Sequence, residues 1–180
     1  MQAGFGEIVI TPPLGVGMAG YFEERLAEGV LDDLHSRALV VSEGDTHAVV
    51  VVTDLISLLS EDVEAVKRHV EARFGIPGSH VLIAASHTHT GPVTNRRPNF
   101  QRNETYMDNW AELTAGAVEL AFRNRVDVTL GVGKGSLPGV AFNRRYRMKN
   151  GRVHTNPGTA NPEIEEVAGP VDPEGTVLRF

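Results

Sequence analysis

The sequence predicts an α/β fold in which a mixed β-sheet packs against at least two helices. Two apolar runs, Ser36–Ser42 and Thr46–Thr53, are separated by a short turn at Gly44, which predicts an antiparallel hairpin. An amphipathic segment, Ser60–Phe74, then precedes a third apolar run, Val81–Ala85. A helix between two strands usually makes a right-handed crossover connection. We therefore expect Val81–Ala85 to join the same sheet as the hairpin.

The composition is that of an ordinary globular protein of 180 residues, 41% apolar and 22% charged, long enough for one domain with a sizeable core. A net charge of −6 argues against a general nucleic-acid-binding surface. The lack of cysteine excludes disulfides and cysteine-based zinc sites. No apolar run approaches the roughly 20 residues that span a bilayer. The segment Met1–Gly6 does not resemble a signal peptide, so we expect a cytoplasmic protein or a secreted one whose signal has been removed.

The first elements in chain order are a short strand and a long loop. Glu7–Ile10 predicts a strand that ends at Pro12, because proline removes ladder donors. Leu14–Leu31 contains four glycines and predicts a loop that is either functional or an ordered surface loop without chemistry.

The predicted strand Thr46–Thr53 contains the continuous apolar run Ala48–Val52, which is typical of burial on both faces. Asp54 follows that run, either as a cap or loop organiser or as an indirect partner of a metal-binding histidine.

Two helices are predicted. The first, Ser60–Phe74, has Ser60 as its N-cap and stops at Gly75. The second begins at Asn103 or Thr105 and runs to about Asn124. Their apolar stripes, expected to face the core, are Val63, Val66, Val70 and Phe74, and Tyr106, Trp110, Leu113, Ala117 and Leu120. His69 lies off the first stripe, which predicts a solvated position.

The last third of the chain predicts short strands and one long loop. Val126–Val132 alternates as a strand, and Asn150-Gly151 predicts a hairpin with a type I′ turn. Thr155–Gly175 carries several prolines and glycines, which favours an extended loop with little regular structure. Thr176–Phe180 reads as a strand. A domain rarely ends on an apolar strand, so we expect further residues of the domain beyond Phe180.

The segment with the strongest chemical signal is His-Thr-His-Thr-Gly-Pro, residues 87–92, at the end of the run Val81–Ala85. At a strand's two-residue period, His87 and His89 point to the same side. Neutral imidazole is the commonest protein metal ligand, so the pair suits a metal site or a proton-transfer site. A catalytic zinc usually needs about three protein ligands, so other segments must contribute. The alternative is that the histidines simply cap a strand end.

The segment that follows the histidine pair is polar and basic. Thr94–Asn103 carries Arg96, Arg97 and Arg102 and predicts either a loop that binds an anionic or polar substrate or a solvated lid. A second basic patch lies near Arg144.

Several segments together resemble the neutral/alkaline non-lysosomal ceramidases. His87–Pro92 is similar to the family's His-Thr-His-Ser-Gly-Pro signature, and Asn143-Arg144 to its Asn-Arg-Ser motif. The other similar segments, in chain order, are Gly4–Pro13, Met18–Tyr21, Arg37–Val41, the run that ends in Asp54, Val171–Pro173 and Val177–Phe180. Thr90 and Arg145 depart from these motifs, each standing where the family has serine. The resemblance covers nearly the whole chain in order.

The resemblance implies a zinc-dependent hydrolase of lipid and sphingolipid metabolism that cleaves the amide bond of ceramide or another N-acyl compound. It implies that His87 is a Zn²⁺ ligand, that His89 hydrogen-bonds the substrate or the attacking water, and that Arg144 holds the substrate or a developing oxyanion. Asn143, Arg96 and Asp54 are the candidate substrate-binding residues. Residues 1–180 would be the N-terminal portion of an incomplete catalytic domain, with the other ligands, a His, a Glu and a Tyr, beyond Phe180. A homo-oligomer is a further expectation.

Three other protein classes are alternatives to a ceramidase-like hydrolase. Metallo-β-lactamase-like hydrolases need Asp-His directly after the histidine pair, whereas Thr90-Gly91 follows it here. Barrel amidohydrolases place His-x-His on the first strand, whereas at least three strands precede it here. The alternative from another class is a truncated, non-catalytic N-terminal module that carries only part of a metal site.

Overall fold

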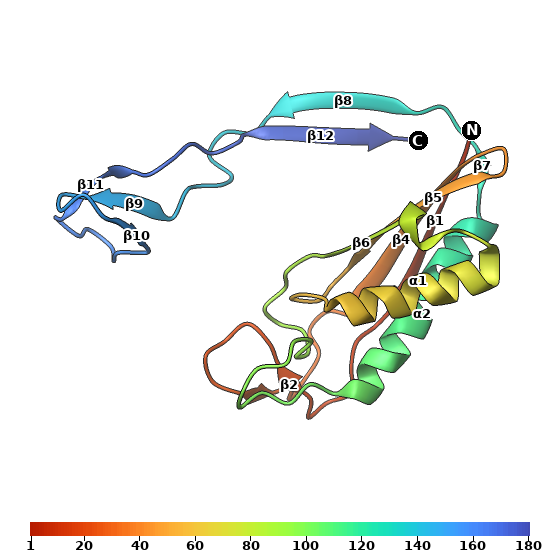
Figure 1. Cartoon of the computed structure of the whole chain (residues 1–180), viewed down its shortest axis with the longest axis horizontal. Helices are drawn as coiled ribbons and strands as arrows, with labels where there is room; N and C mark the ends of the chain where they lie inside the picture. Colours follow the sequence, from red (N-terminus) through yellow and green to blue (C-terminus); the bar gives the residue numbers. More distant parts are fainter. The chain divides into compact units, whose positions relative to one another are not determined.

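The computed structural model describes all 180 residues, which divide into two compact units, Met1–Val128 and Thr129–Phe180 (Figure 1). The first unit contains seven strands, two helices and one 3₁₀ turn: β1 (Gln2–Val9), β2 (Gly17–Met18), β3 (Arg25–Leu26), β4 (His35–Glu43), β5 (Thr46–Thr53), α1 (Ser60–Phe74), η1 (Gly78–His80), β6 (Val81–Ala85), α2 (Glu104–Arg123) and β7 (Val126–Asp127). The second unit contains five strands: β8 (Gly131–Ser136), β9 (Arg145–Met148), β10 (Val153–Thr155), β11 (Ile164–Val167) and β12 (Glu174–Arg179).

The first unit is built on a five-stranded sheet in the order β6-β5-β4-β1-β7. β4 and β5 form the predicted antiparallel hairpin, in which Leu39 lies opposite Val50. After α1, the chain returns as β6, which pairs parallel with β5 and places Leu82 opposite Val50. β1 pairs antiparallel with β4 and β7, so the sheet is mixed. The predicted α/β class, a mixed sheet with two packed helices, is confirmed.

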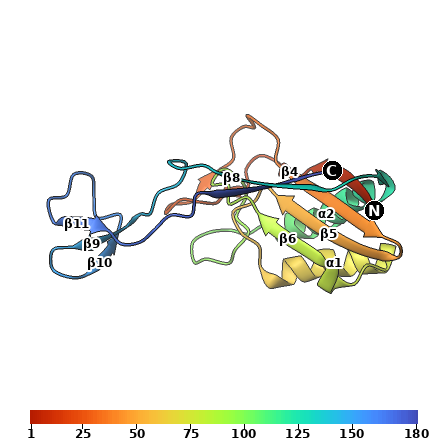
Figure 2. The ribbon, with the colours of Figure 1, turned by 90° about the horizontal axis from the view of Figure 1, so that it is seen from above.

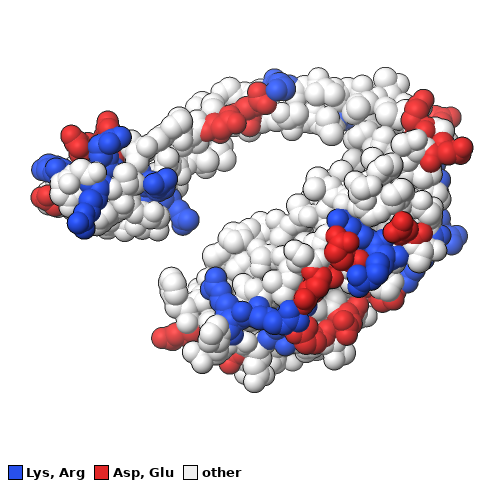
Figure 3. Space-filling view, viewed as in Figure 1, with Lys and Arg blue, Asp and Glu red and all other residues white.

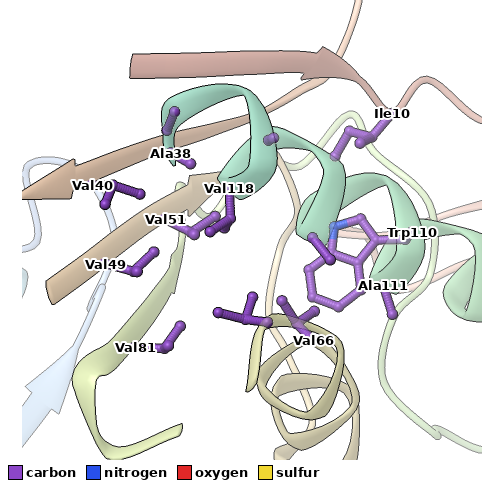
Figure 4. Close-up of a cluster of buried hydrophobic side chains, with 14 of the residues drawn as sticks. Ile10, Ala38, Val40, Val49, Val51, Val66, Val81, Trp110, Ala111 and Val118 are labelled. Carbon is purple, nitrogen blue, oxygen red and sulfur yellow. The ribbon is translucent and has the colours of Figure 1, made fainter. Parts of the chain in front are cut away.

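The core of this unit lies between the sheet and the two helices (Figures 1 and 4). Trp110 on α2 is fully buried, as predicted, and its indole N–H donates to Thr53 Oγ1 on β5 at 3.0 Å. The Tyr106 hydroxyl donates to the Ile10 carbonyl at 2.7 Å, and burial raises the pKa of this phenol. Because these polar ends have partners, the aromatic rings pack in the core without an orphaned polar group.

The two helices cover one face of the sheet, and the other face is seen in the view of Figure 2. On β5, Val49 and Val51 are buried, whereas Val50 and Val52 are 39% and 41% exposed. Leu82 on β6 is 62% exposed, for the same reason. The expectation that the run Ala48–Val52 is buried on both faces is therefore wrong, because this unit supplies helices to only one face.

Both helices have the predicted extent, but one cap differs. Asn103 caps α2, since its Oδ1 accepts from the Tyr106 N–H at 2.9 Å. Ser60 is the first residue of α1 rather than its N-cap, a position that Leu59 occupies with an extended backbone. The Asp62 carboxylate accepts a hydrogen bond from the Leu59 N–H at 3.2 Å. Asp62 thus makes a capping hydrogen bond at the start of α1, a role that Ser60 was expected to fill. α1 ends at Gly75, whose φ is 65°.

The second unit consists of two small sheets. β8 pairs antiparallel with β12, and β9 lies between β10 and β11. The predicted strand at Thr176–Phe180 is confirmed as part of β12. Three details differ from expectation. Val126–Val132 is not one strand, because residues 128–130 separate β7 from β8. Thr155–Gly175 contains the strand β11. Only Gly151 of the Asn150-Gly151 turn has a positive φ, so the turn is not type I′.

On the face shown in Figure 3, acidic and basic side chains lie close to one another rather than forming a field of one sign. Most of the ion pairs are exposed, such as the pair between Lys134 on β8 and Glu174 on β12. His69, expected to be solvated, lies 3.4 Å from Glu112 on α2. Neither helix combines the length and apolarity that crossing a membrane requires.

Candidate active site

The histidine pair lies in a non-regular segment directly after β6. The strand ends at Ala85, and His87 has a φ of 64°, in the left-handed region that non-glycine residues rarely adopt. The strand-period argument for the pair is therefore wrong, because His87 does not continue the strand. The two imidazoles are nevertheless neighbours, with ring centroids 5.0 Å apart and an interplanar angle of 73°. A strained backbone at such a pair is typical of functional sites.

The segment that follows β5 holds His87 in place. The Ser86 N–H donates to the Thr53 carbonyl at 2.9 Å, and the His87 N–H donates to the Leu55 carbonyl at 3.0 Å. His87 Nδ1 lies 2.7 Å from the Ile56 carbonyl oxygen. Because a carbonyl only accepts, Nδ1 carries the proton and Nε2 keeps its lone pair. This is the arrangement that orients a metal-binding histidine.

The glycine-rich loop Leu14–Leu31 packs on the other end of the histidine segment. It is ordered by the two-residue strands β2 and β3, which the sequence analysis did not expect. The Ala19 N–H donates to the Gly91 carbonyl, and the Val93 N–H donates to the Gly17 carbonyl, both at 2.9 Å. These bonds bring Gly20, with a φ of 95°, against His89. The Gly17–Gly20 portion of the loop is thus part of the site.

A cavity of about 410 Å³ lies on the threonine side of the same segment. Thr88 and Thr90 contribute to its lining, and their hydroxyl oxygens are 3.0 Å apart. Its walls are mostly apolar residues of the loop and of the chain before β4: Pro12, Leu14, Val16, Met18, Val30 and Leu34. Its volume is in the range of small-molecule sites.

Asp54 organises the loop between β5 and α1. Its carboxylate accepts from the His35 N–H at 3.0 Å and from the Arg37 guanidinium at 2.9 Å, and it also accepts from the Ser86 side chain. Burial alone would raise the pKa of Asp54, but these hydrogen bonds outweigh it and lower the pKa. Of the two roles expected for Asp54, the observed contacts fit that of loop organiser.

Asp54→Asn should destabilise the fold by about 1–3 kcal/mol at pH 7, because one or more of these donors loses a charged acceptor. The folded-state pKa of Asp54 lies below its unfolded value. Its contribution is therefore present above about pH 4 and lost as the pH falls through the folded pKa. Urea unfolding at pH 7 and at pH 3 measures both effects, and exposed Asp108→Asn is the control. Equal stability loss at the two pH values would contradict this role.

Each of the other candidate residues, Arg96, Asn143 and Arg144, has its hydrogen-bond partners within its own unit. Arg96 forms ion pairs with Glu61 and Glu104, and the hydrogen bond that it donates to Glu61 is the main reason that its pKa is raised. Asn143 and Arg144 belong to the second unit. There, Asn143 Oδ1 accepts from the Arg145 N–H at 2.9 Å, and the exposed Arg144 accepts a backbone hydrogen bond from Asn156 at 3.0 Å.

No group of three or more His, Asp or Glu side chains in the chain is placed to hold a metal ion. His87 is suited to be one metal ligand, because its Nδ1 is hydrogen-bonded to the Ile56 carbonyl whereas its Nε2 has no hydrogen-bond partner. The chain thus has a suitable first ligand without a complete coordination sphere.

Comparison with solved structures identifies the fold. Over 98% of its length the chain matches a neutral ceramidase from Pseudomonas aeruginosa, with a TM-score of 0.71 and 26% sequence identity. The chain has the fold of part of neutral ceramidase. A second structure, a ceramidase complexed with C2, matches with a TM-score of 0.73 and 25% identity, again over 98% of this chain. No family model and no curated protein matches the sequence.

The ceramidase-like chain spans 29% and 28% of the lengths of these two proteins. Because the structural match covers 98% of this chain, it confirms the resemblance to neutral ceramidases that the sequence motifs indicated. Two residues of the site were not singled out from the sequence. Ile56 acts through its backbone carbonyl, which leaves no sequence signal, and Gly20 was only one of several glycines in a loop, though it lies in the Met18–Tyr21 motif.

Proposed function

We propose that this chain forms the His-Thr-His part of a zinc-dependent hydrolase that cleaves the amide bond of an N-acyl lipid or related N-acyl compound. The observation that carries the proposal is the 2.7 Å contact between His87 Nδ1 and the Ile56 carbonyl oxygen. In the neutral ring this contact assigns the proton to Nδ1 and leaves the lone pair on Nε2. It occurs in a chain that has the fold of part of neutral ceramidase.

Bound zinc would supply a water of lowered pKa, about 7, and would polarise the substrate carbonyl. His87 would bind it through Nε2, and the remaining ligands would come from residues outside these 180, since the chain contains no larger ligand group. The hydrogen bond to Ile56 would keep the His87 ring in one tautomer and one orientation.

The other residues have supporting roles in this proposal. His89, whose ring centroid is 5.0 Å from that of His87, would hydrogen-bond the substrate or the attacking water. Arg144 would bind the substrate or stabilise the developing oxyanion, a contribution of about 3–4 kcal/mol for one such donor. Asn143 and Arg96 would contact polar parts of the substrate, and Asp54 would hold the loop that carries Ile56.

The proposed substrate is a small molecule or a lipid with an N-acyl group. The apolar lining of the 410 Å³ cavity beside Thr88 and Thr90 supports a substrate with a hydrocarbon portion. A net charge of −6 with interspersed charges gives no support to nucleic acid as a partner. A cytoplasmic location and a homo-oligomer remain part of the proposal.

The incomplete ligand set favours a second candidate function. A chain that offers one or two metal-binding histidines and no third ligand can act as a non-catalytic module. Such a module would bind zinc weakly, because the ligand count sets affinity. Zinc affinity therefore distinguishes the two candidates.

The experiment that tests the proposal is hydrolysis of a matched pair of substrates by the complete gene product. A ceramide and its ester analogue of equal chain length would be incubated with the protein, and released fatty acid would be measured. We expect amide cleavage that a zinc chelator abolishes and added zinc restores. Cleavage that is insensitive to the chelator, or an absence of amide cleavage together with weak zinc binding, would overturn the proposal in favour of the module.

A further inference from the structure

The position of the His89 imidazole depends on packing alone. None of the hydrogen bonds in the chain involves its ring nitrogens, in contrast to His87, which Ile56 holds. One neighbour of His89 is the His87 ring, and another is the backbone of Gly20. The geometry of a side chain held in this way is set by whatever packs against it.

The contact with Gly20 leaves no room for a side chain. A β-carbon built on Gly20 would lie 2.5 Å from His89 Cβ, 2.5 Å from Cγ and 2.8 Å from Cα. Carbon atoms in van der Waals contact are about 3.5–4.0 Å apart. Rotation of the His89 side chain moves neither Cα nor Cβ, so a rotamer change cannot relieve the clash. The backbone of one of the two segments would have to move.

Both segments are tied to each other close to this contact. Ala19 donates to Gly91, Val93 donates to Gly17, and Met18 and Pro92 form an isolated β-bridge. Ala19 and Pro92 are buried. A shift that separated Gly20 from His89 would therefore strain or break hydrogen bonds on either side of it.

We propose that Gly20 is a positioning residue for His89: the backbone strap Gly17–Gly20 sets where the imidazole lies, and only glycine permits that contact. The inference rests on the proposed function for its catalytic meaning, because His89 is the residue that would contact the substrate or water. The steric statement itself stands on the distances between Gly20 and His89.

Gly15 provides a matched control for backbone strain. It belongs to the same loop and has a φ of 83°, close to the 95° of Gly20, but a β-carbon there would have no atom within 4 Å. Gly15→Ala and Gly20→Ala therefore impose similar conformational strain on an alanine. Only Gly20→Ala adds the clash with His89.

The first readout is the His89 imidazole by NMR, using its ring proton signals at one fixed pH. We expect Gly20→Ala to shift the His89 signals and Gly15→Ala to leave them unchanged. Combining Gly20→Ala with His89→Gly removes the Cβ and Cγ contacts but leaves the 2.8 Å approach to His89 Cα and the strain of the positive φ. The double variant should therefore recover part of the thermal stability that Gly20→Ala loses. Unchanged His89 signals in a folded Gly20→Ala protein, or no recovery in the double variant, would overturn the inference.

The second readout is hydrolysis by the complete gene product. A misplacement of about 1 Å can cost about 100-fold in rate, so Gly20→Ala should lower kcat by that order with a smaller change in KM. Gly15→Ala should retain the wild-type kcat. If the wild-type protein does not hydrolyse amides but the His89 signals still shift, the proposed function fails and the positioning role stands. If wild type and Gly20→Ala hydrolyse equally, the positioning role fails.

Discussion

Replacing His87 with alanine should lower amide hydrolysis by the complete gene product about 100-fold or more, as expected when a group that fixes the reacting geometry is lost. The zinc content of the purified protein should fall with it. The physical reason is that the hydrogen bond from His87 Nδ1 to Ile56 fixes the direction in which His87 Nε2 points. No hydrogen bond fixes the neighbouring ring of His89 in this way. Elemental analysis and kinetics on the same preparation measure both effects.

Two further variants separate a chemical role from a folding role. His87→Asn keeps a residue that tolerates the left-handed backbone at a φ of 64°, so it should fold as wild type does while losing zinc and activity. His69→Ala removes an imidazole on α1 that lies 3.4 Å from Glu112, far in sequence from the site, and should retain both. Zinc and activity that survive in His87→Ala would contradict the assignment.

Asp62→Ala should destabilise the fold by about 3 kcal/mol, the lower end of the cost of breaking a buried ion pair. The carboxylate of Asp62 receives two hydrogen bonds from the Arg102 guanidinium, at 2.5 and 2.9 Å. The two side chains are only 7% and 5% exposed, and the hydrogen bonds to Asp62 are the main cause of the raised pKa of Arg102. Without Asp62, Arg102 keeps Glu104 as a partner, which limits the loss.

The same pair links the start of α1 to the loop that follows the histidine segment. Arg102 also donates to the Thr94 carbonyl, so it fixes both ends of the basic segment Thr94–Asn103. Urea unfolding of Asp62→Ala, with exposed Glu64→Ala as the control, tests its contribution; the control should cost less than about 1 kcal/mol. Equal effects of Asp62→Ala and Glu64→Ala would contradict the prediction.

Periodicity and turn chemistry were enough to predict the framework of the first unit. The bounds of α1 and β5, the β4–β5 hairpin, the return of β6 to the sheet and the burial of Trp110 all follow from local patterns. The exposure of Val50 and Val52 does not, because a strand's apolar run does not reveal how many layers pack on it. The strand β11 was missed because proline and glycine dominate the composition around it.

The site was predictable in its residue types and not in its geometry. The His-Thr-His motif pointed to His87 and His89, but the positive φ of His87 breaks the strand period from which their shared direction was argued. The contact with Ile56 involves a backbone carbonyl, and the contact of Gly20 with His89 involves an absent side chain. Arg96 was chosen for its charge, yet the fold places it between two glutamates. Tertiary contacts of this kind leave no mark on local sequence.

The most direct test of the central claim is anomalous X-ray scattering at the zinc edge from zinc-soaked crystals of the complete gene product. We expect a zinc ion at about 2.0–2.1 Å from His87 Nε2, the usual zinc–imidazole distance. His87 Nδ1 should still face the Ile56 carbonyl in those crystals. A zinc ion bound elsewhere, with His87 Nε2 outside its coordination sphere, or no ordered zinc at all, would contradict the account.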